Sequence, residues 1–250
     1  MADIAVLLKQ VPDTNAKIMV SGGRVDESAV NKWSMSPFDE YALEAALVQG
    51  GSITAITCGP ARAKKMLTDA AAVGATDLMH IVVDDLSALD SNQIATILAA
   101  AVEKSGASVV FCGKQAADTN AGSTGPGVAE MMGAGCVTMV SELTGDSSGF
   151  MALRPSSTGM ERVNVSAPCV IAFDKMGTEL RRPNVKGIMM AKKKAVETLT
   201  VSDLGVDIGS ASVSLDSQSP PAEKPAGQKF EGAENVATVV TKLRDEAKVI

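Results

Sequence analysis

Aromatic residues are scarce in this sequence: Phe, Trp and Tyr together make up 3% of 250 residues. Apolar residues nevertheless make up 46%, so aliphatic side chains and the thirteen methionines must fill most of any core. A chain of this length and composition can form one large domain with appendages.

Other absences exclude classes of protein. No apolar run approaches the ~20 residues that span a bilayer, so no transmembrane segment is expected. Residues 1–10 lead directly into a strand and carry no cleavable signal pattern, which predicts a cytoplasmic protein. The net charge of −6 argues against nucleic acid or an anionic membrane as the main partner.

Side chains that carry chemistry are also few. The four cysteines, at positions 58, 112, 136 and 169, form no CxxC pair and flank apolar runs, which predicts reduced, buried thiols. The one histidine, His80, lies in a strand-like run, LMHIVV, and is expected to be structural. Since no HExxH, nucleophile elbow or Walker A motif is present, we predict neither a catalytic residue nor a metal site.

Apolar runs alternate with helical patterns along the first half of the chain. Strands are expected at 4–11, 53–58, 78–83 and 108–112, and helices at 38–48, about 60–73 and 91–103. This alternation predicts an α/β fold, a doubly wound and mostly parallel sheet with helices on both faces. Ser36 followed by Pro37 predicts the start of the first helix, and Ser91 is the expected N-cap of the third.

Ligands of such sheets bind beyond the carboxyl ends of the strands. Three loops leave those ends, at 9–14, 58–62 and 112–125. We therefore expect these loops to converge on one crevice.

The pattern changes after residue 136. Short strands at 137–140, 151–154, 162–165 and 169–173 are expected to extend the sheet in antiparallel fashion. The Ser/Pro/Ala/Gly-rich stretch 210–227 cannot bury a core of its own, and 234–249 is typical of an amphipathic helix. We accordingly predict a nucleotide-binding domain at 1–190, and an arm and helix at 191–250 that pack on a partner subunit.

The loop after the fourth strand combines small residues with hydrogen-bonding groups. Ser123 and Thr124 stand before a helix start, where hydroxyls and amides can bind phosphate, but simple N-capping explains them equally well. Asp118 could be a general base or could brace the loop, and Lys114 could offset phosphate charge or be solvated. GPG at 125–127 begins a dinucleotide fingerprint that fails at Glu130.

Six motifs occur in order along nearly the whole chain: KQVPDT, MSPFDEYALEAAL, CGPAR, GKQAADTNAGSTG, GIMMAKKK and DLGVD. Together they resemble the β subunit of electron transfer flavoproteins. The resemblance implies an adenine nucleotide α hydrolase-like fold and a heterodimer whose α subunit holds most of the redox FAD, with a structural AMP in the β subunit. Electrons would pass from a dehydrogenase, commonly an acyl-CoA dehydrogenase, to a quinone oxidoreductase or another acceptor. The flavin supplies that chemistry, so the resemblance implies a carrier subunit rather than a self-standing enzyme.

The resemblance also assigns sites by position. Thr14 aligns with the residue that approaches the α-subunit flavin, and Met176 with the loop that anchors partner dehydrogenases. Cys58 would contact the nucleotide through its backbone. The implied nucleotide contacts are Leu7, Ser36, Pro37, Phe38, Asp39, Cys58, Gly113, Lys114, Gln115, Ala116, Ala117, Asp118, Thr119, Asn120, Ala121, Gly122, Ser123 and Thr124.

The sequence departs from the family pattern in places that bear on cofactor and partner. Members that bifurcate electrons, with NADH as donor, bind a second FAD in place of AMP, and their loop carries an Asp and a Gln where Asn120 and Ser123 stand here. AMP is therefore preferred over a second FAD. Ser36 replaces a usual Asn, while 155–159 and 178–185 also differ from the usual runs, which leaves the partner dehydrogenase open.

Two readings from other classes remain. A non-redox nucleotide-binding sensor domain would share the sheet and the crevice, but it would not explain the long arm. A nucleotide-hydrolysing enzyme would need a Walker lysine and a usable base, and His80 lies within a strand.

Overall fold

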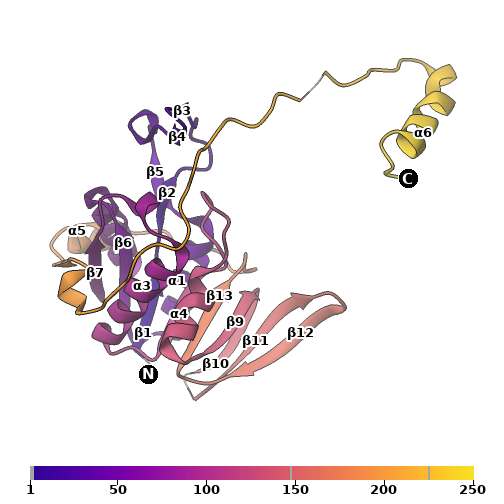
Figure 1. Cartoon of the computed structure of the whole chain (residues 1–250). Coiled ribbons are helices and arrows are strands. Elements are labelled where there is room, and N and C mark those ends of the chain that lie inside the picture. The colour runs from indigo at the N-terminus through magenta and orange to yellow at the C-terminus, as the bar shows by residue number, and fades with distance from the viewer. Residues whose placement is uncertain (1–2, 147, 225) are drawn as a thin grey trace. The chain divides into compact units, whose positions relative to one another are not determined.

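A seven-stranded sheet forms the centre of the fold (Figure 1). Its strands lie in the order β14 (Glu197–Leu199), β7 (Asp77–Val82), β6 (Ser52–Gly59), β1 (Asp3–Leu7), β8 (Val109–Gly113), β13 (Cys169–Phe173) and β9 (Gly135–Val140). Every neighbouring pair in this sheet is parallel. The computed structural model describes residues 3–146, 148–224 and 226–250.

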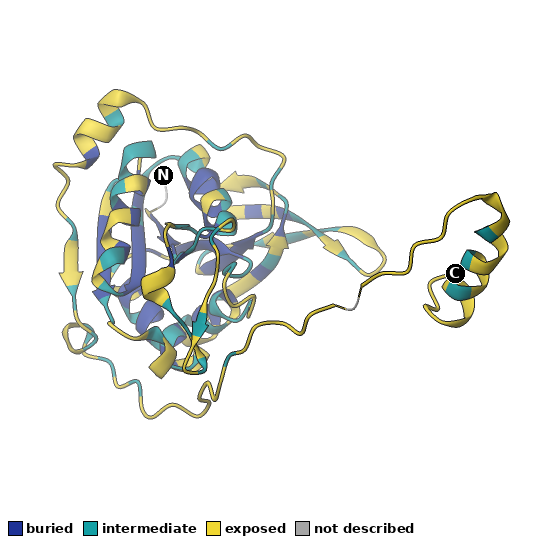
Figure 2. Ribbon diagram, turned by 90° about the horizontal axis from the view of Figure 1, so that it is seen from above, coloured by how far each residue is buried: buried dark blue, intermediate teal, exposed yellow. Residues whose placement is uncertain are grey.

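Helices cover both faces of this sheet (Figure 2). Helices α1 (Pro37–Gln49) and α2 (Lys64–Val73) pack on one face, with Ile4 and Val6 of β1. Helices α3 (Ser91–Ser105) and α4 (Thr124–Met132) pack on the other, with Ala5 and Leu7. Successive residues of β1 are thus buried on opposite faces, which is why the strand is apolar throughout. The doubly wound α/β prediction is confirmed.

The chain reverses its direction across the sheet at β1. It proceeds outward from β1 to β6 and β7, and then returns to place β8 on the other side of β1. The carboxyl ends of β1 and β8 therefore form a topological switch point, where open α/β sheets hold their ligands.

The sequence predicted antiparallel strands that extend the main sheet. This prediction is wrong, because the antiparallel strands form a separate sheet. Strands β10 (Glu142–Asp146), β11 (Gly149–Ser156) and β12 (Gly159–Val165) form a separate three-stranded antiparallel sheet beside β9. Its Phe150 and Ala152 join the apolar cluster of α1 and α2. Strands β9 and β13 instead extend the main sheet in parallel, because the intervening three strands give the chain enough length to cross back.

Two helix starts differ in detail from the sequence prediction. Asp90, not Ser91, caps α3: its carboxylate accepts from the backbone N–H of Gln93, whose side chain accepts in turn from the backbone N–H of Asp90. This reciprocal pair satisfies two helix-start donors. Pro37 begins α1 after Ser36 as predicted, but the Ser36 hydroxyl makes no capping hydrogen bond and is buried without a partner.

Several small elements were not predicted. They are β5 (Trp33–Met35), β3 (Val20–Ser21) paired with β4 (Arg24–Val25), helix α5 (Val185–Ala191), the edge strand β14, and the 3₁₀ turns Glu27–Ala29, Leu86–Ala88 and Ser202–Leu204. The single strand predicted at 4–11 is instead two strands, β1 and β2 (Gln10–Pro12), and β2 pairs with β5. The helix predicted at about 60–73 begins with the 3₁₀ turn Ala61–Ala63.

The chain divides into two compact units, which we call the body (Met1–Gln218) and the tail (Ser219–Ile250). The first part of the predicted arm is hydrogen bonded within the body: Ser212 N–H donates to Asp90 Oδ2 at 2.7 Å, and Gln218 N–H donates to the carbonyl of Gly23 at 2.8 Å. The packing of residues 191–250 on a partner stays a prediction.

The tail carries a 3₁₀ turn (Ala233–Asn235) and helix α6 (Val236–Asp245), which is shorter than the predicted 234–249. None of its described residues is buried. Within residues 3–146, 148–224 and 226–250, the structure contains no helix long and apolar enough to cross a membrane.

Candidate functional site

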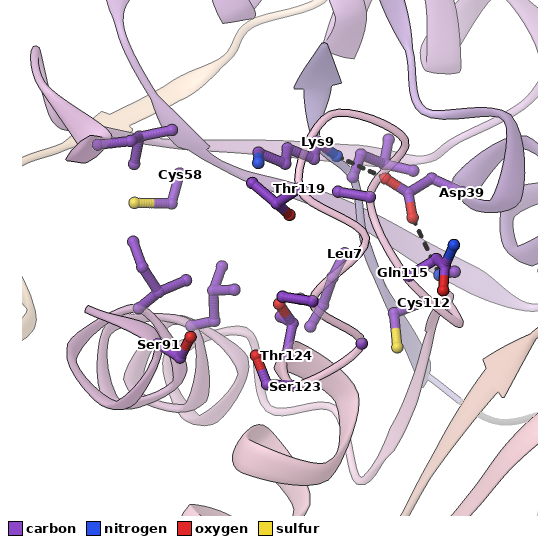
Figure 3. Close-up of a pocket in the computed structure, with 18 of the residues that line it drawn as sticks. Leu7, Lys9, Asp39, Cys58, Ser91, Cys112, Gln115, Thr119, Ser123 and Thr124 are labelled. Atoms are coloured by element: carbon purple, nitrogen blue, oxygen red, sulfur yellow. Dashed lines mark hydrogen bonds between the residues drawn. The ribbon is translucent and has the colours of Figure 1, made fainter. Parts of the chain in front are cut away.

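A cavity of about 210 Å³ lies at the switch point, at the carboxyl ends of β1 and β8 (Figure 3). All three loops expected to converge there contribute to it, through Lys9, Cys58 and the stretch 112–124. The predicted residues that line it are Leu7, Asp39, Cys58, Gly113, Lys114, Gln115, Ala116, Thr119, Ala121, Gly122, Ser123 and Thr124. The others, Thr14, Ser36, Pro37, Phe38, Ala117, Asp118 and Asn120, do not line it.

Asp39 connects the segment that follows β1 to the last residue of β8. Its Oδ2 accepts from the backbone N–H of Lys9 at 2.7 Å, and its Oδ1 accepts from the backbone N–H of Gly113 at 3.0 Å. Burial raises the pKa of Asp39 from 3.8 to about 7, although the two N–H donors oppose the shift. The carboxylate therefore braces the floor of the cavity.

Gly113 is required by this close approach. A Cβ at this position would lie 2.5 Å from Asp39 Oδ1 and 2.7 Å from the Cβ of Phe38. Phe38 thus shapes the site by packing on the strand end rather than by lining the cavity.

The start of α4 faces the cavity through Ser123 and Thr124. Ser123 occupies the N-cap position, yet its side chain makes no capping hydrogen bond. The first N–H groups of a helix have no intrahelical acceptor, so this end presents amide donors together with two hydroxyls. The capping interpretation of Ser123 is not realised, and phosphate binding here stays a prediction.

Both charged residues of the loop have protein partners. Lys114 Nζ lies 2.8 Å from Asp174 Oδ2 and 4.8 Å from the centroid of the Phe38 ring. Asp118 accepts from Lys9 Nζ at 2.7 and 2.9 Å. Asp118 therefore braces the loop through a lysine side chain, in addition to accepting from the adjacent Thr119 N–H.

The opposite wall is apolar and comes from the region after β7 and from α3. Leu86, Leu89, Ile94 and Leu98 line it, and Asp90 and Ser91 stand at its edge. An apolar wall facing hydroxyl and amide donors suits a ligand with a flat base and an anionic end.

Residues 25–204 match the family model for the electron transfer flavoprotein domain. The chain is 32% identical to "Electron transfer flavoprotein subunit beta" of Bacillus subtilis, with 99% of this chain and 100% of the relative covered. It is 34% identical to the protein of that name from Bradyrhizobium diazoefficiens, with 99% of each covered, and 33% identical to that of Homo sapiens, with 100% of each covered. The chain belongs to the electron transfer flavoprotein β-subunit family.

In this family member, sequence reasoning missed one whole side of the cavity. The stretch 86–98 follows strand β7, so the strand-end rule that selected the other three loops would also have selected this one. Lys9 lay within a selected loop but was not singled out. Leu8 and Cys112 lie beside predicted residues in the strand ends.

The remaining assigned positions lie elsewhere. Thr14 is exposed in the turn after β2, next to Asp13, whose carboxylate lies 2.6 Å from Lys32 Nζ. Met176 is half-buried against the cluster of α1 and α2 and lines a second cavity with Glu44 and Val48.

The cysteines are free thiols in strands, as predicted, and all but Cys136 are buried. Burial raises the pKa of Cys58 to about 12, so its thiol is not a nucleophile at neutral pH. His80 is buried in β7, with Nε2 2.9 Å from the carbonyl oxygen of Gly59. No group of three or more metal-ligating side chains occurs in the described part of the chain.

Proposed function

We propose that this chain is the β subunit of a heterodimeric electron transfer flavoprotein, with AMP held structurally in the cavity and the redox FAD held mainly by the α subunit. The full-length similarity to β subunits supports the assignment. The single observation that carries the nucleotide site is the uncapped start of α4 at the topological switch point.

The residues around the cavity fit AMP. Leu89, Ile94 and Leu98 offer an apolar surface for a purine base. Ser123, Thr124 and the first amides of α4 offer donors for one phosphate, favoured there by the positive end of the helix dipole. Such a nucleotide would connect the α3 side of the cavity to the α4 side.

In this proposal FAD would supply the redox chemistry when bound mainly by the α subunit, and Thr14 of this chain would approach it. Thr14, which is exposed and does not line the cavity, suits a contact with a cofactor on another subunit. A scarcity of catalytic side chains suits a carrier, because the flavin performs the electron transfer.

The proposal includes a donor dehydrogenase, of the acyl-CoA dehydrogenase type, docking near Met176, and a quinone oxidoreductase or another acceptor. The loop around Met176 is held in place by Arg181, whose Nη2 and backbone N–H donate to the buried carboxylate of Glu44 at 2.7 and 3.1 Å. A loop held by a bidentate charge pair is pre-organised for docking. We expect this carrier in the cytoplasm.

The test is the nucleotide content of the purified heterodimer. Denaturation should release one FAD and one AMP per heterodimer. Two FAD and no AMP would overturn the AMP assignment and support a bifurcating subunit that takes electrons from NADH. A chain that is a stable monomer, indifferent to any flavin-bearing partner, would instead favour a non-redox nucleotide-binding domain.

A further inference from the structure

The loop 115–123 contributes to the lining of the cavity and is held at its two ends. At one end, Lys114 N–H donates to the carbonyl of Phe173 at 2.7 Å and Lys114 Nζ pairs with Asp174. At the other end, Thr124 begins α4. The stretch between these ends, 115–123, bonds within itself, for example from Asn120 N–H to the carbonyl of Ala116.

One ion pair ties the middle of this loop to another part of the body. Among the described residues, the hydrogen bonds from 115–123 to segments outside the loop and α4 are those between Asp118 and Lys9 Nζ, at 2.7 and 2.9 Å. Lys9 follows β1 and lines the cavity. The pair therefore joins the loop to the end of β1, beside the cavity.

The two sides of this pair differ in how firmly they are held. The backbone of Lys9 is fixed on both sides, since its N–H donates to Asp39 and its carbonyl accepts from Ser36 N–H at 3.0 Å. Asp118 lies in a loop of small residues that uses left-handed backbone at Asn120 and Gly122, with φ of 52° and 68°. Breaking the pair would remove the hydrogen bonds from Asp118 to Lys9, while the backbone bonds that hold Lys9 would remain.

The pair is exposed enough to break. The side chains of Lys9 and Asp118 are 31% and 28% exposed, so water and salt reach both charges. Ion pairs of this kind are weak and screened by salt. Such a pair can form and break reversibly, so it suits a loop that opens and closes.

We propose that the Lys9–Asp118 pair is a latch that holds the loop 115–123 over the nucleotide, which makes Lys9 a positioning residue that slows nucleotide release. The inference rests on the proposed nucleotide site. The proposed role of Lys9 depends on its contact with the loop and does not depend on which base the bound nucleotide carries.

The experiment measures how fast bound AMP leaves the purified heterodimer when labelled AMP is added in excess. K9M should release AMP about threefold to fivefold faster than the natural chain, as expected for a partly exposed ion pair. The control, K65M, removes the exposed Lys65–Asp69 pair of α2 and should leave the rate unchanged. Raising salt from about 0.01 M to about 1 M should speed release from the natural chain and have little effect on K9M.

A charge swap separates the latch from a direct contact with the ligand. The double variant K9D/D118K should restore slow release, and K9R should retain it. Unchanged release in K9M, or fast release in the swap, would overturn the latch. If K9M fails to fold, D118N breaks the same pair from the loop side. Natural heterodimer that contains no nucleotide would defeat the proposed function instead, so the two failures are distinguishable.

Discussion

The body and the tail place their apolar side chains in opposite environments. In the body, Phe111, Phe150 and Phe173 are fully buried at the centre of one apolar cluster. In the tail, Val236, Val240 and Leu243 recur on one face of α6 and are 60%, 37% and 37% exposed. The body contains its own core, whereas the tail has the pattern of a core-facing helix without a core of its own.

This difference indicates that the body and the tail are stabilised in two different ways. The body is stabilised by burial of apolar side chains within one chain. The apolar face of α6 gains stability only from a surface that the tail itself does not provide, which agrees with the proposed packing on an α subunit. The cavity lies between these cases, because its walls are folded but the Ser123 side chain lines it without a capping hydrogen bond.

The largest expected effect is in the interior of the body. Phe111 contacts Phe150 and Phe173 edge to face, with ring centroids 6.0 and 5.0 Å apart. Phe111→Ala should lower the free energy of unfolding by about 3–5 kcal/mol, measured by urea denaturation. Val240→Ala in the tail is the matched control and should change the value for the isolated chain by less than about 0.5 kcal/mol. Equal effects would remove the distinction between body and tail.

A smaller effect is expected at the start of α4. Ser123→Leu or Thr124→Leu should remove one or two charge-assisted hydrogen bonds to phosphate, each worth roughly 1.5–3 kcal/mol. AMP content and the melting temperature of the heterodimer should both fall, while Ser123→Thr, which keeps the hydroxyl, should retain AMP. Unchanged content and melting temperature in the leucine variants would count against phosphate binding here.

Asp39 makes the stability of the body depend on pH. Its pKa is raised to about 7 in the folded chain, from 3.8, so between these values the folded state binds more protons than the unfolded state. Stability from this group is present below pH 4 and is lost as pH rises through 7, by up to about 1.4 kcal/mol per pH unit. Asp39→Asn should flatten this slope in urea denaturation series from pH 5 to about 8. A variant with the same slope as the natural chain would show that another group is responsible.

The smallest effect is expected from removing the tail. A chain that ends at Gln218 should unfold within about 0.5 kcal/mol of the full chain, because no described residue of the tail is buried. Its association with the α subunit, followed by gel filtration, should weaken. A large loss of stability in the isolated body would show that the tail contributes to its fold.

Much of the fold could be predicted from local patterns. The runs at 53–58 and 78–83 became β6 and β7 with small shifts at their ends, because strands buried on two faces are apolar at every position. The loop at 112–125 was located by the same rule. The direction of β9 and β13 was not predictable, since a strand has the same local pattern whether its neighbour runs parallel or antiparallel.

The sequence by itself determined the family, the alternation of strands and helices, and the edge of the sheet that carries the cavity. Only the tertiary structure decided that Lys9 pairs with Asp118, that Lys114 pairs with Asp174, and that the stretch 86–98 forms the apolar wall. The physical reason is distance along the chain. The apolar pattern of a strand or helix is written in residues a few positions apart, whereas the partner of a charged side chain is set by which distant segments the sheet order brings together.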